Sequence, residues 1–337
     1  MEPVVAVLAN GLGNQMSCIA GAIEYASDPR RAGRPIKLDG HGLWGGKNKH
    51  EENPPEAAAL KFWPDLPRLE RRQGKSVSEY AHEHFLPHFK ALNIFWETQR
   101  RNKNVTILYK GYSYHHFASE NVLKDVVTRY AIVPSPSKSI YELTAGNIRD
   151  LDNAFFIHIR RGDFKNVWNR RIFGIDLHKQ YYPKALAKFA GYLHAGARVL
   201  VCSDDIPWCK KNLVRLYPQV PVAAWTYCNA ARADDTLVFM ASCKLGGITA
   251  NSSLSWWGMV LGSYKFHTEK RLYITPKNFI RVAWPLQSAT KSRVLLPHGV
   301  VSIETGDLYM DDVFVIFVAA LLVVYLVIYR ITKLANK

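Results

Sequence analysis

The chain has 337 residues, of which 48% are hydrophobic, enough for a sizeable core and more than one average domain needs, so two domains are expected. Lysine and arginine outnumber aspartate and glutamate 44 to 28, so the charge predicts an anionic partner: nucleic acid, anionic lipid or a phosphorylated small substrate. The sequence disfavours nucleic acid, since it has no zinc-finger spacing, no aromatic and basic RNA-binding signature and no isolated basic tail.

The first half of the chain starts with a valine-rich strand at residues 4–9, a glycine turn at residues 10–15 and a helix at residues 16–26. Residues 28–75 are rich in Pro, Gly, Arg and Lys without a sustained period, which predicts irregular structure or an insertion. Further elements are expected as a helix at 78–91, a strand at 105–109 and a helix at 119–130. The prolines of VPSPS, residues 133–137, resist helix and central strand, so this segment is the predicted domain boundary.

The second half alternates strands with helices, a pattern typical of a parallel sheet covered on both faces. Ligands of such sheets lie beyond the carboxyl ends of the strands. The expected strands are 154–159, 198–202, 220–224, 244–249 and 271–275, and the expected helices are 181–195, 208–217, 235–242 and 253–261.

Residues 313–329 form an apolar run of 17 residues with acids before it and bases after it. At about 1.5 Å per residue the run spans about 25 Å, so it predicts a C-terminal membrane anchor rather than a buried core helix. The N-terminus lacks a signal peptide pattern, and post-translational insertion would leave the folded part in the cytosol. The positive-inside rule points to the lumenal side instead, where the sequon at Asn104 would matter. Of the two orientations, the cytosolic one is favoured.

The five cysteines show no C-x-x-C spacing, so buried free thiols are expected. They are Cys18, Cys202, Cys209, Cys228 and Cys243.

The segment HIRRGD, His158 to Asp163, comes directly after the apolar residues 154–157 and gives the clearest chemical signal. Neighbouring arginines at a strand exit are costly unless they meet anions, and the planar donors of Arg160 and Arg161 suit diphosphate oxygens. Asp163 could orient a guanidinium group or accept from a sugar hydroxyl. An arginine-rich surface loop is the alternative.

Two further polar clusters follow strands of the same sheet. Asp204 and Asp205, after the strand at 198–202, could accept from ribose or base, cap the next helix, or hold a divalent metal, for which no third ligand is spaced. Asn251, Ser252 and Ser253 open a helix whose free amides attract phosphate.

One aromatic pair and one acidic pair lie on either side of the cluster at residues 251–253. Trp256 and Trp257 fit core packing better than base stacking. Asp234 and Asp235 open the preceding helix, where they would favour its dipole or contact a nucleotide base.

In order and spacing, these segments resemble the alpha-1,2-fucosyltransferases of glycosyltransferase family 11. The resemblance covers most of the chain before the membrane run, but almost none of residues 28–130. The segments that carry it are GLGNQ (11–15), HIRRGD (158–163), YYPKAL (181–186), CSDDIPWC (202–209), DDTLVFMASCKLGGITANSSLSWWG (234–258) and, more weakly, ITPKNF (274–279).

The resemblance implies a GT-B fold of two Rossmann-like domains facing a cleft: an acceptor-side domain at 1–135 and a domain at 140–305 that binds GDP-L-fucose. It implies transfer to a glycan hydroxyl with inversion and without a metal or other cofactor, since an arginine stabilises the β-phosphate of the leaving GDP. Arg160 is the first candidate for that arginine and Arg161 the second.

By the same resemblance, Ser252 and Ser253 would brace the phosphates, with Asn251, Asp204 and Asp205 also on the donor side. His158 and Asp235 would contact ribose or guanine, and Asn14 would lie where donor meets acceptor. Asp163 is a candidate base, although a dissociative transition state with weak base assistance is equally consistent.

Animal members of the family carry an N-terminal anchor, whereas the predicted anchor here is C-terminal. Two alternatives remain: fucosyl transfer to a protein hydroxyl, which the long SSLSWWG element disfavours, and a non-catalytic protein whose basic surface binds lipid headgroups.

Overall fold

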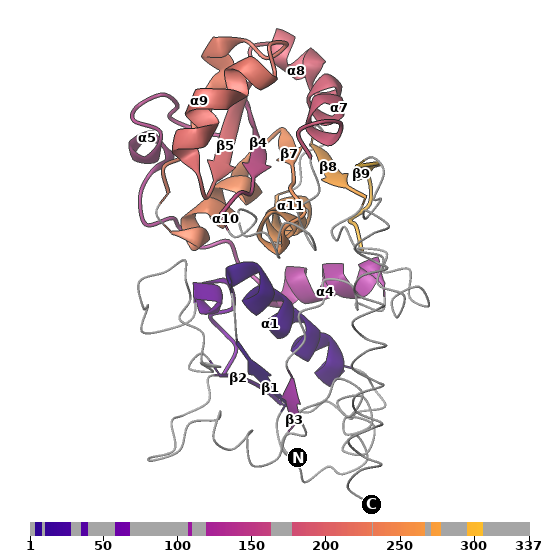
Figure 1. Ribbon diagram of the computed structural model, residues 1–337. Helices are drawn as coiled ribbons and strands as arrows, with labels where there is room; N and C mark the ends of the chain where they lie inside the picture. Colours follow the sequence, from indigo (N-terminus) through magenta and orange to yellow (C-terminus); the bar gives the residue numbers. More distant parts are fainter. Residues whose placement is uncertain are drawn as a thin grey trace, which may run out of the picture.

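The computed structural model describes residues 4–8, 11–27, 35–39, 58–67, 107–109, 119–162, 177–230, 232–266, 271–277 and 295–305. These residues form two parallel β-sheets with helices packed on them, which confirms the predicted α/β class (Figure 1). The predicted helix at 78–91, the sequon at Asn104 and the predicted membrane run at 313–329 lie outside the described residues. Within them, no helix has the length and apolar character needed to cross a membrane.

The smaller sheet has the strand order β2-β1-β3, with β1 at Val4–Val7, β2 at Ile36–Asp39 and β3 at Ile107–Tyr109. Helix α1 follows β1 at Leu12–Ser27, so it begins four residues before the predicted start at Met16. The reason is that Gly11 O accepts from the backbone N–H groups of Asn14 and Gln15, which makes the glycine turn the first turn of the helix.

Residues 28–75 contain regular structure, so the prediction of an irregular segment was wrong in part. The segment supplies strand β2 and the 3₁₀ helix η2 at Ala58–Phe62. The side chains of Phe62 and Trp63 are 0% and 1% exposed, and they contribute to the core between the sheets. Both elements are too short to show a period of their own, so only their tertiary contacts stabilise them.

The larger sheet has the order β6-β5-β4-β7-β8-β9, with every pair parallel. Its strands are β4 (Ala154–Ile159), β5 (Arg198–Ser203), β6 (Trp225–Tyr227), β7 (Gly246–Ile248), β8 (Leu272–Pro276) and β9 (Val301–Ile303). The helices that accompany this sheet are α5 (Ile140–Leu143), α7 (Tyr181–Lys188), α8 (Ala190–His194), α9 (Ile206–Leu216), α10 (Ala233–Ser242) and α11 (Ser253–Lys265).

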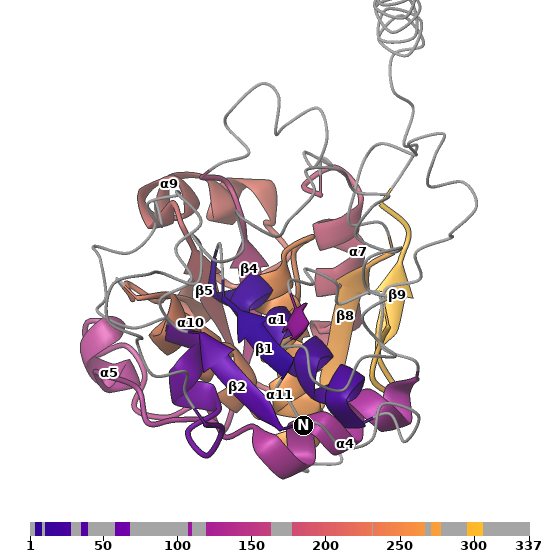
Figure 2. The same cartoon turned by 90° about the horizontal axis from the view of Figure 1, so that it is seen from below.

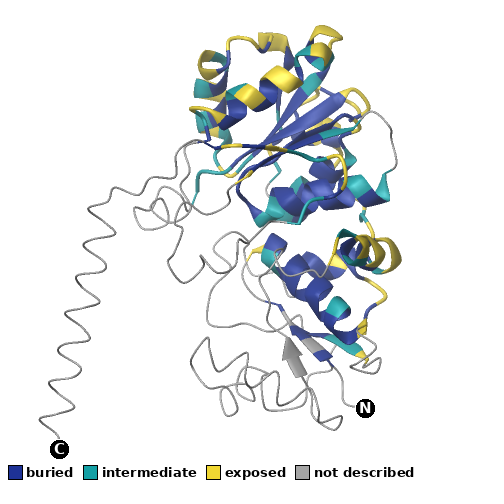
Figure 3. Cartoon of the chain, turned by 90° about the vertical axis from the view of Figure 1, so that its right-hand side faces the viewer, coloured by how far each residue is buried: buried dark blue, intermediate teal, exposed yellow. Residues whose placement is uncertain are grey.

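All six residues of β4 are buried, because helices cover both faces of the sheet (Figure 3). Phe155, Ile157 and Ile159 pack with residues of α7, α8 and α9. Ala154 and Phe156 point to the opposite face, where α10 and α11 pack. By the two-residue period of a strand, His158 belongs to this second face.

Two predicted elements of the second half differ from the observed ones. The helix predicted at 181–195 is divided into α7 and α8 at Phe189. The strand predicted at 220–224 is wrong, since Pro221 precedes a short 3₁₀ helix at Val222–Ala224 and β6 begins only at Trp225. Proline has no N–H for a strand ladder, which explains the later start. Strand β9 and helix α5 were not predicted.

The two sheets share one hydrophobic core, formed where α1, η2 and helix α4 (Glu120–Tyr130) meet α10 and α11 (Figures 1 and 2). Trp63 and Trp257 meet edge to face with centroids 6.4 Å apart, and Trp257 Nε1 donates to Ser17 Oγ at 3.0 Å. Trp256 and Trp257 are both fully buried, which confirms their predicted core role. All five cysteines are free and buried, as predicted.

Candidate functional site

The larger sheet reverses its strand order between β4 and β7. From β4 the chain adds β5 and β6 on one side, and then it returns to add β7, β8 and β9 on the other. In a parallel sheet with helices on both faces, such a reversal leaves a crevice beyond the carboxyl ends of the two strands. We call this place the switch crevice; the loops after β4 and β7 border it.

Two of the predicted clusters meet at the switch crevice. Arg160, the first residue after β4, donates from Nη1 to Ser252 Oγ, which follows β7, over 3.0 Å. The two residues are 92 positions apart in sequence, and only the parallel pairing of β4 with β7 brings them together. The pairing joins a guanidinium group to the start of helix α11.

The loop after β7 presents the first turn of α11 to Arg160. Ser252 is the N-cap residue, but its side chain makes no capping hydrogen bond, and its Oγ accepts from Arg160 instead. Ser255 Oγ accepts from Ala250 N at 3.1 Å and so fixes the loop. Asn251 and Ser252 are buried and Ser253 is half-buried. Amide groups at such a helix start favour an anion.

Arg161 points away from Arg160, toward helix α9. Its guanidinium carbon lies 3.7 Å from the centre of the Trp208 ring, and its Nε donates to Asp205 Oδ2 at 3.3 Å. Asp205 also caps α9 by accepting from Trp208 N at 3.2 Å. The structure thus separates the two arginines, and it leaves Arg160 as the one beside the helix start.

Asp204 contacts the backbone of the HIRRGD segment. Its Oδ1 accepts from Arg161 N and its Oδ2 from Gly162 N, each at 2.8 Å. The sequence suggested a donor contact, a helix cap or a metal ligand for Asp204 and Asp205. The observed cap at Asp205 confirms one of these readings. Among the described residues no three His, Cys, Asp or Glu side chains are grouped to hold a metal, and metal independence stays a prediction.

His158 lies inside β4, not after it, because the strand runs to Ile159. The residue is only 5% exposed, and within the described part of the chain its Nδ1 has no hydrogen-bond partner. Burial lowers the pKa of His158 to about 4, although Asp204 opposes the shift, and Arg160 adds to it. His158 is therefore neutral at pH 7, and it lies two residues before Arg160 in the chain.

Two tyrosines brace the strand ends that border the crevice. Tyr182 Oη donates to His158 O at 2.7 Å, and Tyr181 Oη lies 2.8 Å from Thr249 O and 2.9 Å from Ile274 O. Burial raises the pKa of both hydroxyls well above the ordinary value. The sequence analysis quoted YYPKAL as a motif but gave these residues no role, since the paired carbonyls lie on β4, on β8 and just after β7.

The smaller sheet reaches the site through the GLGNQ turn. A Cβ on Gly13 would stand 2.6 Å from Leu254 N and from Ser253 Oγ, so the first turns of α1 and α11 touch. Asn14, one residue further along α1, is half-buried near this contact. The structure therefore brings GLGNQ and the start of α11 together, as the prediction for Asn14 requires.

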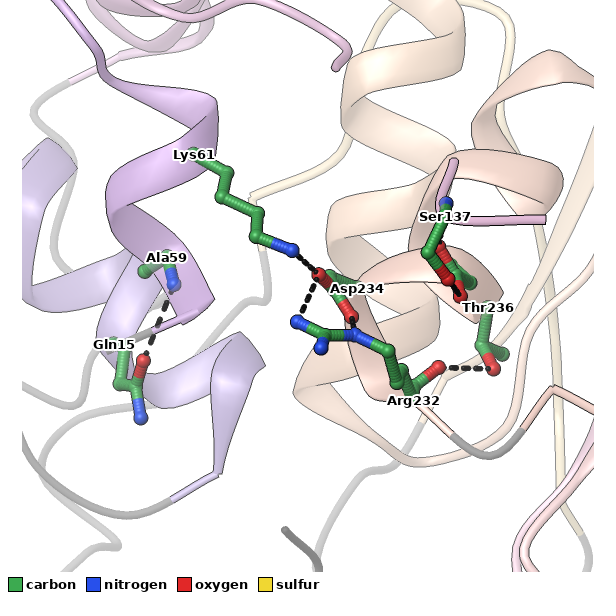
Figure 4. A network of polar contacts seen from close by, with 8 residues as sticks. Gln15, Ala59, Lys61, Ser137, Arg232, Asp234 and Thr236 are labelled. Carbon is green, nitrogen blue, oxygen red and sulfur yellow. Dashed lines mark hydrogen bonds and ion pairs between the residues drawn. The ribbon is translucent and has the colours of Figure 1, made fainter. Parts of the chain in front are cut away.

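Asp234 of helix α10 forms a salt bridge to the 3₁₀ helix η2. It accepts from Arg232 at 3.0 and 2.9 Å and pairs with Lys61 of η2 (Figure 4). Burial alone would raise the pKa of the Asp234 carboxyl, but the hydrogen bonds from Arg232 and Lys61 outweigh it and keep the pKa low. Sequence reasoning missed Lys61, because it lies in the segment expected to be irregular.

Asp235 forms hydrogen bonds with the predicted domain boundary at residues 133–137. Its carboxylate accepts from Ser137 N at 2.7 Å and from Ser137 Oγ. The structure therefore shows Asp234 and Asp235 in contact with protein groups, and a contact of Asp235 with ribose or guanine stays a prediction. Asp163 lies outside the described residues.

A family model described as Glycosyl transferase family 11 matches residues 78–280. The chain belongs to this family. The match confirms the resemblance read from the motifs, and it includes Arg160 and Ser252. The GLGNQ turn lies before the matched segment of this family 11 glycosyl transferase.

Curated relatives of this family 11 chain include two proteins of Escherichia coli. The O-antigen biosynthesis glycosyltransferase WbnK is 29% identical over 128 residues, 38% of this chain and 39% of that protein. An alpha-1,2-colitosyltransferase is 34% identical over 113 residues, 33% of this chain and 37% of that protein. The chain thus covers less than two fifths of either relative. No solved structure matches it significantly.

The family to which the chain belongs is one of glycosyl transferases. The switch crevice supplies two features that bind phosphate oxygens, namely a guanidinium group and a helix start beyond the end of a parallel sheet.

Proposed function

We propose that the chain transfers L-fucose from GDP-L-fucose to a hydroxyl of a glycan, the 2-OH of a terminal galactose, with inversion and an alpha-1,2 linkage. The observation that carries this proposal is the contact between Arg160 and Ser252 at the switch crevice. It joins a planar cation to a helix start, and both bind phosphate oxygens. The name of one relative, the alpha-1,2-colitosyltransferase, supports the 1,2 linkage.

In the proposed reaction the bond between the anomeric carbon and the β-phosphate oxygen breaks, and the acceptor oxygen forms a new bond to that carbon. Negative charge grows on the diphosphate as GDP leaves. Arg160 and the first amides of α11 stabilise this charge without a metal, and Ser252 orients the guanidinium group. The acceptor proton passes to Asp163 or, in a dissociative reaction, to solvent after the bond has broken.

We also propose a GT-B arrangement for the two sheets, with the donor held by the larger sheet and the acceptor approaching from the side of α1. The switch crevice on the larger sheet and the contact of Gly13 with the start of α11 support this assignment. Asn14 would then lie where donor and acceptor meet. For Asp204, one of the predicted donor ligands, the geometry supports another role, described below.

For the run at residues 313–329 we propose a single membrane anchor, with the catalytic part on the cytosolic side. The apolar character and charge-free length of the run support this assignment. Protease protection in sealed microsomes tests the orientation. Complete protection of the residues before the run would place them in the lumen and contradict the proposal.

The experiment that tests the reaction uses the full chain in detergent with GDP-fucose and a panel of galactose-terminated glycans. We expect GDP release that depends on the acceptor, a product with fucose on the galactose 2-OH, and no change on adding a chelator. GDP-mannose serves as the matched donor control. Chelator-sensitive turnover would contradict the metal-free mechanism, and activity with none of the glycans would contradict the acceptor assignment.

A further inference from the structure

The backbone after β4 is held by a side chain from the neighbouring strand. The two carboxylate oxygens of Asp204, just beyond β5, accept from the successive amides of Arg161 and Gly162, each at 2.8 Å. Hydrogen bonds to a charged acceptor are about twice as strong as neutral ones. The carboxylate therefore fixes a short turn of main chain that no strand ladder reaches.

The two hydrogen bonds of Asp204 determine the direction in which the Arg160 side chain extends. On one side of Arg160, Ile159 is paired with Ser203 in the β4–β5 ladder. On the other side, Asp204 fixes the two amides that follow. Arg160 is thus the single residue between two fixed points, and its side chain extends to Ser252 Oγ. Arg161 is directed instead to Trp208 and Asp205.

Gly162 allows the carboxylate to come this close. A Cβ at Gly162 would stand 2.6 Å from Asp204 Oδ2 and 3.2 Å from its carboxyl carbon. Gly162 does not belong to the glycines with positive φ, so its backbone conformation is open to alanine. Glycine is needed at position 162 because a larger residue would block the Asp204 carboxylate. Gly162 and Asp204 therefore fix the turn together.

We propose that Asp204 is a positioning residue: with Gly162 it fixes the turn that aims Arg160 at the donor diphosphate, and it does not itself bind the nucleotide. The inference rests on the proposed function, because it needs a diphosphate donor. It also changes the expected role of CSDD, whose first acid holds the backbone of HIRRGD and whose second caps α9.

The affinities of the full chain for GDP and GMP test this inference, because the two nucleotides differ by the β-phosphate alone. Wild type should bind GDP more tightly than GMP. Arg160→Ala should lower the GDP affinity about 10- to 100-fold with the GMP affinity retained, and Asp204→Ala should lower the GDP affinity about 10-fold in the same selective way. Asp152→Ala, at an exposed acid paired with Lys244, is the control and should change neither affinity.

The possible outcomes separate this inference from the proposed function. No preference of the wild type for GDP would contradict both. A preference that Arg160→Ala abolishes and Asp204→Ala leaves intact would contradict the positioning role alone. Equal losses of GDP and GMP affinity in Asp204→Ala would also contradict it, since they would indicate a direct contact with the nucleoside.

A double-mutant cycle with Gly162→Ala provides a second test on variants that keep a regular backbone. Gly162→Ala should lower the GDP affinity about as much as Asp204→Ala, because the new Cβ displaces the carboxylate. In the Asp204→Ala background the same change should have less than a twofold further effect. Gly191→Ala, where a Cβ meets nothing within 4 Å, is the control. Additive losses in the double variant would overturn the proposal.

Discussion

His158 makes the stability of the fold sensitive to acid. Its pKa is lowered to about 4 by burial, whereas an unfolded histidine titrates near 6.5. Below pH 6.5 the unfolded chain therefore binds a proton that the folded chain does not. The free energy of unfolding should fall as the pH drops from about 6.5 to 4, by on the order of 3 kcal/mol from this residue.

Urea unfolding at several pH values checks this prediction. In His158→Gln the loss between pH 6.5 and 4 should be smaller than in wild type, while His194→Gln, at an exposed histidine, should keep the wild-type slope. Equal slopes for wild type and His158→Gln would show that His158 is not held neutral in the fold.

At the scale of residues, the sequence predicted which side chains border the crevice but not all of their contacts. Arg160 and Ser252 were predicted because arginines at a strand exit and hydroxyls at a helix start share one chemistry. The contacts of Asp204 with two amides were not predictable, since they depend on the pairing of β4 with β5. The strand that contains His158 was predicted with the bounds observed for β4, residues 154–159.

At the scale of elements, the contact between α1 and α11 has a specific requirement for glycine at position 13. A Cβ there would meet the backbone of Ser253 and Leu254 at 2.6 Å, and backbone cannot move aside as a side chain can. Gly13→Ala should lower the free energy of unfolding by about 1–3 kcal/mol, as overpacking does.

Gly11→Ala is the matched control for Gly13→Ala, because a Cβ at Gly11 meets nothing within 4 Å. Chemical denaturation of both variants gives the comparison. Similar stabilities for the two variants would contradict a close contact between the first turns of α1 and α11.

The long elements of the second half were predicted well, because apolar strands and amphipathic helices alternate regularly along this part of the chain. Short elements were missed. Strand β2 has four residues, β9 has three, and neither has a pattern of its own. The break at Phe189 and the late start of β6 reflect local backbone geometry that an apolar pattern does not record.

At the scale of the whole molecule, one core joins the two sheets. Trp63, which follows η2, packs with Trp257 of α11 and with residues of α1, and Lys61 pairs with Asp234 across the same junction. The two parts should therefore unfold together. Calorimetry should show one transition with equal calorimetric and van't Hoff enthalpies. Two resolved transitions would indicate that each sheet is stable alone.

The most direct measurement of the central claim is GDP release from GDP-fucose in the presence of a galactose-terminated glycan by wild type and Arg160→Ala. Loss of a donor that stabilises developing charge should lower kcat about 10²- to 10³-fold with the free energy of unfolding little changed. Arg215→Ala, at an exposed arginine of α9, should keep wild-type kcat. If Arg160→Ala released GDP at the wild-type rate, the assignment of the switch crevice as the diphosphate site would be wrong.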